Sequence, residues 1–224
     1  MLISGHGSNL NALANAIQRE KLPIEIAAVI SDRSDANGLT IAQSLGIPTH
    51  VIASRAKGKI GSDFDQVLIE TLSRAGPDLI VLAGFMRILG PRVVRQFKNR
   101  VINIHPSLLP AFRGLNAHQQ ALDAGVRFSG CTVHYVVEDV DAGPIIAQAV
   151  VPVLPGDTAD TLAIRVHKQE HILFPAVIKG FAAGQISLAY EMGRDVVKLK
   201  PPLRFPFETS ALMSIVTDQP AKVT

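Results

Sequence analysis

The chain contains one cysteine and no tryptophan, and only 18% of its 224 residues are charged. The lone cysteine, Cys131, cannot form an internal disulfide, which fits a reducing cytosol. Because Cys131 lies in an apolar run, it is expected in the core rather than as a nucleophile. The formal charge of +3 is small and scattered, so nucleic acid is not the expected ligand, whereas a small anionic substrate is compatible.

Long apolar runs are also lacking. The longest comprises residues 79–83 followed by Phe85 and Met86, far short of the ~20 residues that a membrane helix needs. The N-terminus shows no basic segment ahead of an apolar run, so no signal peptide is expected. With 47% hydrophobic residues, the chain can still form a substantial core. These features predict a soluble, cytoplasmic protein without a membrane partner.

Strand-like and helix-like segments alternate through the first half of the chain. Strands are expected at residues 1–4, 23–31, 49–52, 79–82 and 101–104. Apolar residues recur at helical spacing over residues 9–17, 39–45 and 64–72. This order predicts an α/β fold with a doubly wound, mostly parallel sheet.

The second half departs from this rhythm. Strands expected at residues 131–137 and 145–153 are joined by a loop too short for a helical crossover, so they should be antiparallel strands added to the sheet. Asp157 or Thr158 is expected to cap a long helix that ends near residue 182.

The length of the chain predicts one large domain, and no internal repeat divides it. Prolines become frequent from Pro201 onward, which predicts a loosely packed tail over residues 201–224. Residues 1–200 are therefore expected to form a single catalytic domain.

The most informative motif is Asn103-Ile104-His105-Pro106-Ser107-Leu108-Leu109-Pro110. Side chains alternate along a strand, so Asn103 and His105 should project to the same side at its end, where open α/β sheets bind ligands. A neutral amide donor can stabilise an oxyanion while the imidazole moves a proton. The alternative is that both residues merely cap a turn.

Asp141 favours the catalytic interpretation. It lies in the loop Val140-Asp141-Ala142-Gly143-Pro144, between the two strands of the second half. A carboxylate beside His105 would fix the tautomer of the ring and favour the charged imidazolium. His134, on the strand before this loop, is expected to be a hydrogen-bonded core histidine.

A glycine-rich segment, Ser4-Gly5-His6-Gly7-Ser8-Asn9-Leu10, joins the first strand to the first helix. Such a turn at a helix N-terminus suits an anion. Asp32, at the end of the second strand, makes a dinucleotide site conceivable, but Leu10 replaces the third glycine of that fingerprint. A monophosphate held by Gly7, Ser8 and Asn9 is therefore predicted, with a tight turn and an asparagine cap as the alternative.

Two further features are compatible with ligand binding. Phe85, Met86, Ile88 and Leu89 could line a slot for a flat ring, with Arg87 at its mouth for a carboxylate, although such residues are more often core. Glu170 falls in register with the apolar stripe of the long helix. It could face a polar ligand such as a sugar, or pair with Arg165 or His167 near the surface.

Together these motifs resemble the phosphoribosylglycinamide formyltransferase family, folate-dependent enzymes of purine synthesis. The matching motifs are Gly5-x-Gly7-Ser8-Asn9-Leu10, Gly84-Phe85-Met86-Arg87, the stretch from Asn103 to Pro110, Asp141-x-Gly143-Pro144 and Gln169-Glu170-His171. They come in the family's order and cover about residues 1–200. The resemblance implies a Rossmann-like formyltransferase fold, with the ribonucleotide phosphate in its N-terminal half and folate in its C-terminal half.

The resemblance also implies residue roles. The catalytic set would be Asn103, His105 and Asp141, and the ribonucleotide would bind to Gly7, Ser8, Asn9 and Glu170. Folate would lie against Met86, Arg87, Ile88, Leu89, Val94, Val136, Glu138 and Asp139. The amine of glycinamide ribonucleotide would attack the formyl carbon of the co-substrate, 10-formyltetrahydrofolate, and give a tetrahedral intermediate. Neither a metal nor a covalent enzyme intermediate is implied, and the enzyme would be a monomer or homodimer.

The sequence departs from the family pattern in three places. The first strand is several residues short. A segment that often reads Ser-Arg-Glu reads Gly61-Ser62-Asp63 here, so the arginine that would contact the folate tail is missing, with Lys59 as a candidate substitute. Asn116 stands where a histidine is common.

Three alternatives share parts of this pattern, two of them enzymes and one a binding module. Methionyl-tRNA formyltransferase has the catalytic motif, but also a further C-terminal domain and a basic surface. Formyltetrahydrofolate deformylase uses water in place of the amine and carries an extra N-terminal domain. A non-enzymatic nucleotide-binding module is the third alternative, and the intact Asn103, His105 and Asp141 argue against it.

Overall fold

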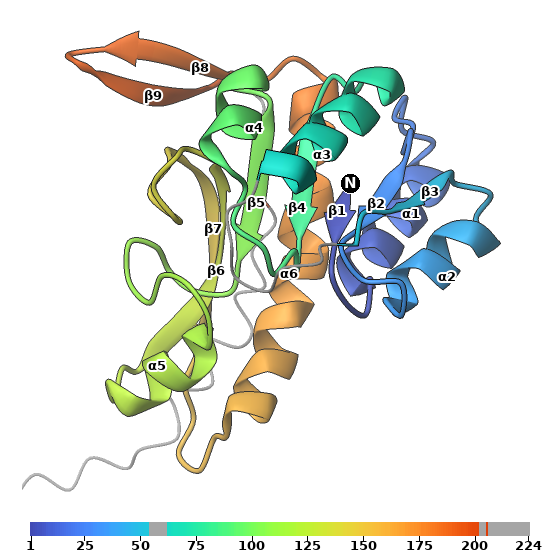
Figure 1. Ribbon diagram of the computed structural model, residues 1–224. Helices are drawn as coiled ribbons and strands as arrows, with labels where there is room; N and C mark the ends of the chain where they lie inside the picture. Colours follow the sequence, from blue (N-terminus) through green and yellow to red (C-terminus); the bar gives the residue numbers. More distant parts are fainter. Residues whose placement is uncertain (54–61, 202–204, 206–224) are drawn as a thin grey trace, which may run out of the picture.

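A computed structural model describes residues 1–53, 62–201 and 205 of the chain (Figure 1). Its centre is a seven-stranded sheet of order β3-β2-β1-β4-β5-β6-β7. The parallel strands are β1 (Leu2–Ile3), β2 (Val29–Ser31), β3 (Thr49–Val51), β4 (Ile80–Ala83) and β5 (Val101–His105). The antiparallel strands are β6 (Phe128–Tyr135) and β7 (Ile145–Pro152). The mostly parallel sheet with antiparallel additions confirms the predicted fold class.

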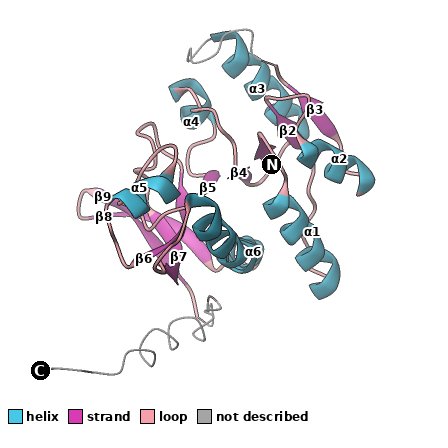
Figure 2. Ribbon diagram, turned by 90° about the horizontal axis from the view of Figure 1, so that it is seen from below, coloured by secondary structure: helices cyan, strands magenta, loops and turns pink. Residues whose placement is uncertain are grey.

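Helices cover both faces of the sheet. One face carries α1 (Ser8–Glu20), α2 (Asn37–Ser44) and α6 (Ala159–Ala182), and the other carries α3 (Ser62–Ala75) and α4 (Pro91–Gln96). Figure 2 shows α1 and α6 side by side, with α3 and α4 across the sheet from them. The short helix α5 (Ala117–Asp123) packs against α6.

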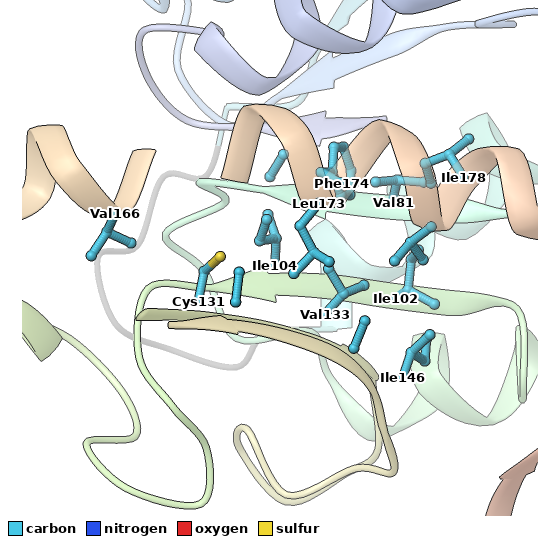
Figure 3. Packing of buried hydrophobic residues seen from close by; sticks show 14 of the residues in the cluster. Val81, Ile102, Ile104, Cys131, Val133, Ile146, Val166, Leu173, Phe174 and Ile178 are labelled. Atoms are coloured by element: carbon cyan, nitrogen blue, oxygen red, sulfur yellow. The ribbon is translucent and has the colours of Figure 1, made fainter. Parts of the chain in front are cut away.

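Alternation along the central strands divides the core into two clusters. Ile102 and Ile104 of β5 face α6, where Leu173 and Phe174 are fully buried (Figure 3). Val101 packs instead with the cluster under α3 and α4. Because side chains of a strand point to alternate faces, Asn103 and His105 must lie on the α3 and α4 side. The packing of β5 thus fixes the direction of the two polar side chains.

The second strand is shorter than the sequence predicted. Strand was expected over residues 23–31, but β2 comprises only Val29–Ser31. A strand extends only as far as its partners allow, and β1 supplies two residues, Leu2 and Ile3, opposite Ile30 and Ser31. The first strand is also shorter than the expected residues 1–4, since β1 comprises only Leu2–Ile3.

The long helix begins where the sequence predicted. Thr158 is its N-cap, and the Thr161 backbone N–H donates to the Thr158 hydroxyl at 3.3 Å. The Thr158 N–H donates to the Thr161 hydroxyl at 2.9 Å, which completes a capping box. The helix ends at Ala182, as expected.

Three elements were not predicted, a short helix and the two strands of a hairpin. The helix α4 has only six residues, too few to show a periodic pattern. The strands β8 (Ile186–Glu191) and β9 (Arg194–Leu199) form a separate hairpin, which projects from the body in Figure 1. Apart from Pro201 and Phe205, the expected tail over residues 201–224 lies outside the described residues, as do Lys59 and Gly61.

Candidate active site

The site begins at the end of β5. This strand pairs in parallel with β4 and antiparallel with β6, with Asn103 opposite His134 and His105 opposite Thr132. His105 is the last residue of the strand and is only 5% exposed. The hydroxyl of the buried Ser107 donates to the Ala111 carbonyl at 2.6 Å, which leaves it badly placed to act as a nucleophile.

Asp141 lies directly against His105. The distance between Asp141 Oδ2 and His105 Nδ1 is 3.3 Å, and the Gly114 backbone N–H donates to the same oxygen at 2.8 Å. On the other side of the ring, Nε2 donates to the Phe112 carbonyl at 2.9 Å. Both ring nitrogens therefore face acceptors, so the ring is held in place on both sides and each nitrogen has a partner to which it can donate. The predicted proximity of Asp141 and His105 is confirmed.

His134 belongs to the same cluster, which the sequence did not reveal. The Asn103 side-chain amide donates to His134 Nε2 at 3.2 Å, and His134 Nδ1 donates to the Tyr135 carbonyl at 2.8 Å. Burial lowers the pKa of His134, against the opposing effects of that carbonyl and the nearby Asp141 carboxylate. A neutral His134 with a fixed tautomer holds the Asn103 amide in one orientation. The expected core histidine is thus hydrogen-bonded, as predicted, but to a candidate catalytic residue.

The loop that carries Asp141 approaches the sheet closely. A Cβ atom on Gly143 would lie 1.8 Å from the Tyr135 carbonyl oxygen, so only glycine fits at this position. This contact brings the loop down onto β6 and places the Asp141 carboxylate between His105 and His134, 3.3 Å from the first and 3.6 Å from the second.

The glycine-rich segment forms the N-terminus of α1. Gly7 is the N-cap residue in a left-handed conformation, with φ of 76°. A Cβ atom on Gly7 would lie 2.5 Å from the Cα atom of Gly38, so the two backbones touch. The first N–H groups of α1, beginning at Ser8, have no acceptor within the helix, and no side chain caps them at Gly7. Such a helix N-terminus suits an anion.

Asn9 connects this segment to α6 rather than capping α1. Its side-chain amide donates to Glu170 Oε2 at 2.9 Å, and both residues are buried. The asparagine-cap alternative is therefore wrong. A surface pair between Glu170 and Arg165 is also wrong, because Glu170 is 4% exposed and Arg165 binds Asp157 instead. Burial raises the pKa of Glu170, and the Asn9 hydrogen bond opposes this increase.

Asp32 is already engaged in the fold. The Ser4 hydroxyl donates to Asp32 Oδ1 at 2.6 Å and accepts the Met86 backbone N–H at 2.8 Å. Ser4 thereby joins the ends of β1, β2 and β4. These bonds give Asp32 a structural role and argue against the dinucleotide alternative.

The expected folate residues divide into an exposed and a buried set. Met86 and Ile88 are 64% and 55% exposed, so the expectation that such residues are plain core is wrong for these two. Leu89 and Val94 are buried in the cluster under α3 and α4, against which Val136 also packs. Glu138 and Asp139 are exposed, and Glu138 binds Arg95 of α4 at 3.0 Å. The Arg87 guanidinium lies over the Phe64 ring, 4.2 Å from its centroid.

A groove of about 1080 Å³ between α1 and α6 reaches Ser8 and His171 but is not lined by Asn103, His105 or Asp141. Within residues 1–53, 62–201 and 205, no group of three or more His, Cys, Asp or Glu residues is arranged to hold a metal ion. The described helices include none that is long and apolar enough to span a membrane.

Comparisons with known proteins agree with this geometry. A family model described as formyl transferase matches residues 1–178. The chain is 44% identical over 188 residues to the phosphoribosylglycinamide formyltransferase of Escherichia coli (strain K12), which covers 84% of this chain and 88% of that protein. It is 48% identical over 194 residues to the trifunctional purine biosynthetic protein adenosine-3 of Bos taurus, covering 87% of this chain and 19% of that protein.

The chain thus spans about a fifth of the length of this trifunctional relative. Among solved structures, glycinamide ribonucleotide transformylase 1 from Symbiobacterium toebii superposes with a TM-score of 0.82 at 45% identity, covering 89% of this chain and 92% of that one. The sheet, the helices on both of its faces and the antiparallel strands are shared with such proteins over most of the chain. The chain belongs to the formyl transferase family.

Proposed function

We propose that this chain is a phosphoribosylglycinamide formyltransferase, which transfers the formyl group of 10-formyltetrahydrofolate to the amine of glycinamide ribonucleotide in purine biosynthesis. The observation that carries the proposal is the cluster of Asn103, His105 and Asp141 at the end of β5. It combines an oriented amide donor, an imidazole with acceptors at both nitrogens and a carboxylate, which suits formation and collapse of a tetrahedral intermediate.

The amine nitrogen attacks the formyl carbon directly, and the carbonyl oxygen becomes an oxyanion. The Asn103 amide donates one hydrogen to His134 and has its second hydrogen available for this oxyanion. His105 donates to the same oxygen by exchanging its hydrogen bond to the Phe112 carbonyl. These hydrogen bonds strengthen as negative charge develops on the oxygen. They therefore lower the activation barrier instead of only tightening substrate binding.

The bond between the formyl carbon and the folate nitrogen then breaks. His105 protonates the departing nitrogen, and Asp141 receives the proton that the attacking amine gives up, directly or through water. Asp141, 3.3 Å from His105, holds the positive charge on the ring until the proton is transferred. The side chains themselves supply the donors and acceptors for these steps, so we propose no metal.

The ribonucleotide lies between the phosphate loop and α6 in this proposal. Gly7, Ser8 and Asn9 hold the phosphate at the N-terminus of α1, and Glu170 binds a ribose hydroxyl. Folate binds against the exposed Met86 and Ile88, with Leu89, Val94 and Val136 beneath and Arg87, Glu138 and Asp139 at its edges.

We further propose that residues 1–200 act as one catalytic domain, as a monomer or homodimer in the cytoplasm. The single cysteine supports this location, because it is buried and has no second cysteine with which to form a disulfide. Small molecules are the only partners that this function requires.

The test is folate product formation by the purified protein with 10-formyltetrahydrofolate, with and without glycinamide ribonucleotide. Turnover that depends on the ribonucleotide supports the transferase. Turnover without it supports formyltetrahydrofolate deformylase, in which water replaces the amine. Failure of either reaction with a folded protein supports the nucleotide-binding module instead.

A further inference from the structure

The backbone around Gly114 reaches the candidate catalytic residues from a loop. Residues 106–116 join β5 to α5 and belong to neither a helix nor a strand. Within this loop, the Gly114 N–H donates to Asp141 Oδ2 at 2.8 Å. The Asp141 carboxylate lies further from His105 and His134, at 3.3 and 3.6 Å. The closest of these three partners is therefore a backbone group whose own position no ladder or helix fixes.

Gln120 of α5 holds this part of the loop on both sides of Gly114. Its side-chain Nε2 donates to the Arg113 carbonyl at 3.1 Å and to the Leu115 carbonyl at 2.8 Å. The side-chain amide has two N–H donors, so both bonds can exist together. Gln120 is itself fixed by the helix, since its backbone N–H donates to the Asn116 carbonyl at 3.0 Å. One side chain thus ties the backbone around Gly114 to α5.

Gln120 and Asp141 bind opposite edges of the same peptide unit. The Arg113 carbonyl and the Gly114 N–H belong to one planar trans peptide, so they point in opposite directions. Gln120 donates to the carbonyl edge, and Asp141 accepts from the N–H edge. A hydrogen bond to the carbonyl polarises the peptide and strengthens its N–H as a donor. Gln120 therefore orients this N–H and also strengthens its bond to Asp141.

The Asp141 carboxylate depends on such support because it faces two histidines at once. Its oxygens are directed at different rings, Oδ2 at His105 Nδ1 and Oδ1 at His134 Nε2. A rotation of the carboxylate would exchange or break these contacts. By binding Oδ2, the Gly114 N–H holds that oxygen on the side of His105.

We propose that Gln120 is a positioning residue for formyl transfer, acting on Asp141 through the peptide unit of Arg113 and Gly114. The inference rests on the proposed function, in which Asp141 receives the proton of the attacking amine and stabilises charge on His105. The alternative is that Gln120 only ties the loop to α5. That alternative predicts a loss of stability without a selective loss in the chemical step.

The experiment replaces Gln120 by methionine, which keeps the length of the side chain and favours a helix but has no N–H donor. We expect kcat to fall about tenfold, while KM for the ribonucleotide and for formyl-folate stays within about twofold of the original. Gln120→Glu keeps the shape of the side chain but presents oxygens to the two carbonyls, so it should lower kcat at least as far.

Gln119→Met is the matched control. Gln119 precedes Gln120 on α5, is exposed and donates to Asp123 instead of to the loop. This variant should keep the original kcat. An unchanged kcat in Gln120→Met, or an equal loss in Gln119→Met, would overturn the positioning role.

A double-mutant cycle with Asp141 identifies the route by which Gln120 acts. Asp141→Ala removes both carboxylate oxygens, so Gln120 has nothing left to orient. In this background Gln120→Met should lower the residual rate by less than about twofold, measured with enzyme in excess over substrate. A tenfold loss here as well would mean that Gln120 acts on another group, and the proposal would be wrong.

The NMR signal of the Gly114 amide proton tests the contact without turnover. A hydrogen bond to a carboxylate shifts an amide proton downfield, so the signal should move upfield in Asp141→Ala and, by less, in Gln120→Met. An unmoved signal in Gln120→Met would overturn the inference even in an active transferase. An upfield shift in a protein that transfers no formyl group to the ribonucleotide would support the role of Gln120 and remove the proposed reaction.

Discussion

At the scale of single residues, the environment of His105 fixes the ring in place. The side chain is almost fully buried, and each ring nitrogen faces an acceptor, Phe112 on one side and Asp141 on the other. A donor held in this way can serve a developing oxyanion without reorganising at the moment of reaction.

His105→Ala or Asp141→Asn should lower kcat at least ~100-fold, as loss of a general acid or an oxyanion donor does. Steady-state turnover with saturating ribonucleotide and formyl-folate measures the effect. Ser107→Ala is the control, because its hydroxyl is bonded to the Ala111 carbonyl and should leave kcat within a few-fold of the original. Near-normal turnover of either catalytic variant would refute the assignment.

His134 acts through Asn103, as a positioning residue. His134→Phe removes the acceptor of the Asn103 amide, so the amide loses its fixed orientation, and we expect kcat to fall about tenfold. Burial holds the pKa of His134 low, so protonation at acidic pH should also turn this acceptor into a donor and depress kcat in the original protein.

The pH profile of kcat, recorded down to pH 5, distinguishes positioning from stability alone. The acid-side loss due to His134 should be absent in His134→Phe. Tyr135→Phe, the neighbour on β6, keeps the backbone carbonyl that His134 bonds and serves as the control. An unchanged kcat in His134→Phe would show that the amide needs no support.

Glu170 illustrates a conflict between function and stability. Burial raises the pKa of Glu170. Between pH ~4 and the folded-state pKa, the folded protein therefore binds more protons than the unfolded chain. The contribution of Glu170 to stability therefore declines as pH rises from about 4 through the folded-state pKa. Glu170→Gln should remove this decline and unfold at an equal or higher denaturant concentration at pH 8, while KM for the ribonucleotide rises at least about tenfold.

Denaturant unfolding at pH 5 and pH 8, together with KM, tests this pair of effects. Glu20→Gln is the control, since Glu20 also joins α1 to α6, through Lys179 at 2.8 Å, but lies on the surface. It should leave KM unchanged. A KM for Glu170→Gln equal to that of the original protein would remove Glu170 from the ribonucleotide site.

The sequence was sufficient for those site residues that carry a distinctive chemical type. Asn103, His105 and Asp141 stand at strand ends and in a loop marked by glycine and proline, and the structure brings them together. His134 was missed as part of the site because its role depends on lying opposite Asn103 across two antiparallel strands. The two residues are 31 positions apart in the sequence, and the register that pairs their strands cannot be predicted from either local pattern.

At the scale of elements, caps were easier to predict than lengths. Thr158 marked the start of α6 because a hydroxyl that bonds the first turn is a local signal. The length of β2 instead depends on β1 and β3, which are far from it in the sequence. The hairpin of β8 and β9 turns at Met192-Gly193 rather than at Asn-Gly or Asp-Gly, so it lacked the strongest local signature.

The start of α6 also carries a pH-dependent contribution to stability. Asp157 binds Arg165 through two bonds of 2.8 and 3.0 Å, and this pair lowers the pKa of Asp157 to about 2. Because the folded-state pKa lies below the ordinary value of about 4, the stabilisation is present above that pH and is lost as pH falls toward about 2. Asp157→Asn should lower the free energy of unfolding at pH 7 by about 2 kcal/mol. The variant should also lose less stability than the original protein as the pH falls.

Unfolding in denaturant between pH 2 and pH 7 measures both quantities. Asp160→Asn, exposed in the first turn of α6, should cost less than about 1 kcal/mol and keep the loss of stability at acidic pH. Equal effects of the two variants would mean that only helix-end charge matters.

At the scale of the whole molecule, the two faces of the sheet depend on each other. The clusters under α6 and under α3 share β4 and β5, whose alternate side chains supply both. Neither cluster can lose its packing without exposing the strands that support the other. The catalytic residues lie at the end of β5, so the site also depends on both faces.

Residues 1–200 should therefore unfold in one cooperative transition. Leu68 of α3 and Leu173 of α6 are fully buried on opposite faces, and each change to alanine should cost about 2–5 kcal/mol. Both variants should lower the midpoint of a single transition, with equal calorimetric and van't Hoff enthalpies. If Leu68→Ala instead split the transition, the part of the sheet under α3 and α4 would be a separate unit. The chain would then consist of two domains, with the catalytic residues at their boundary.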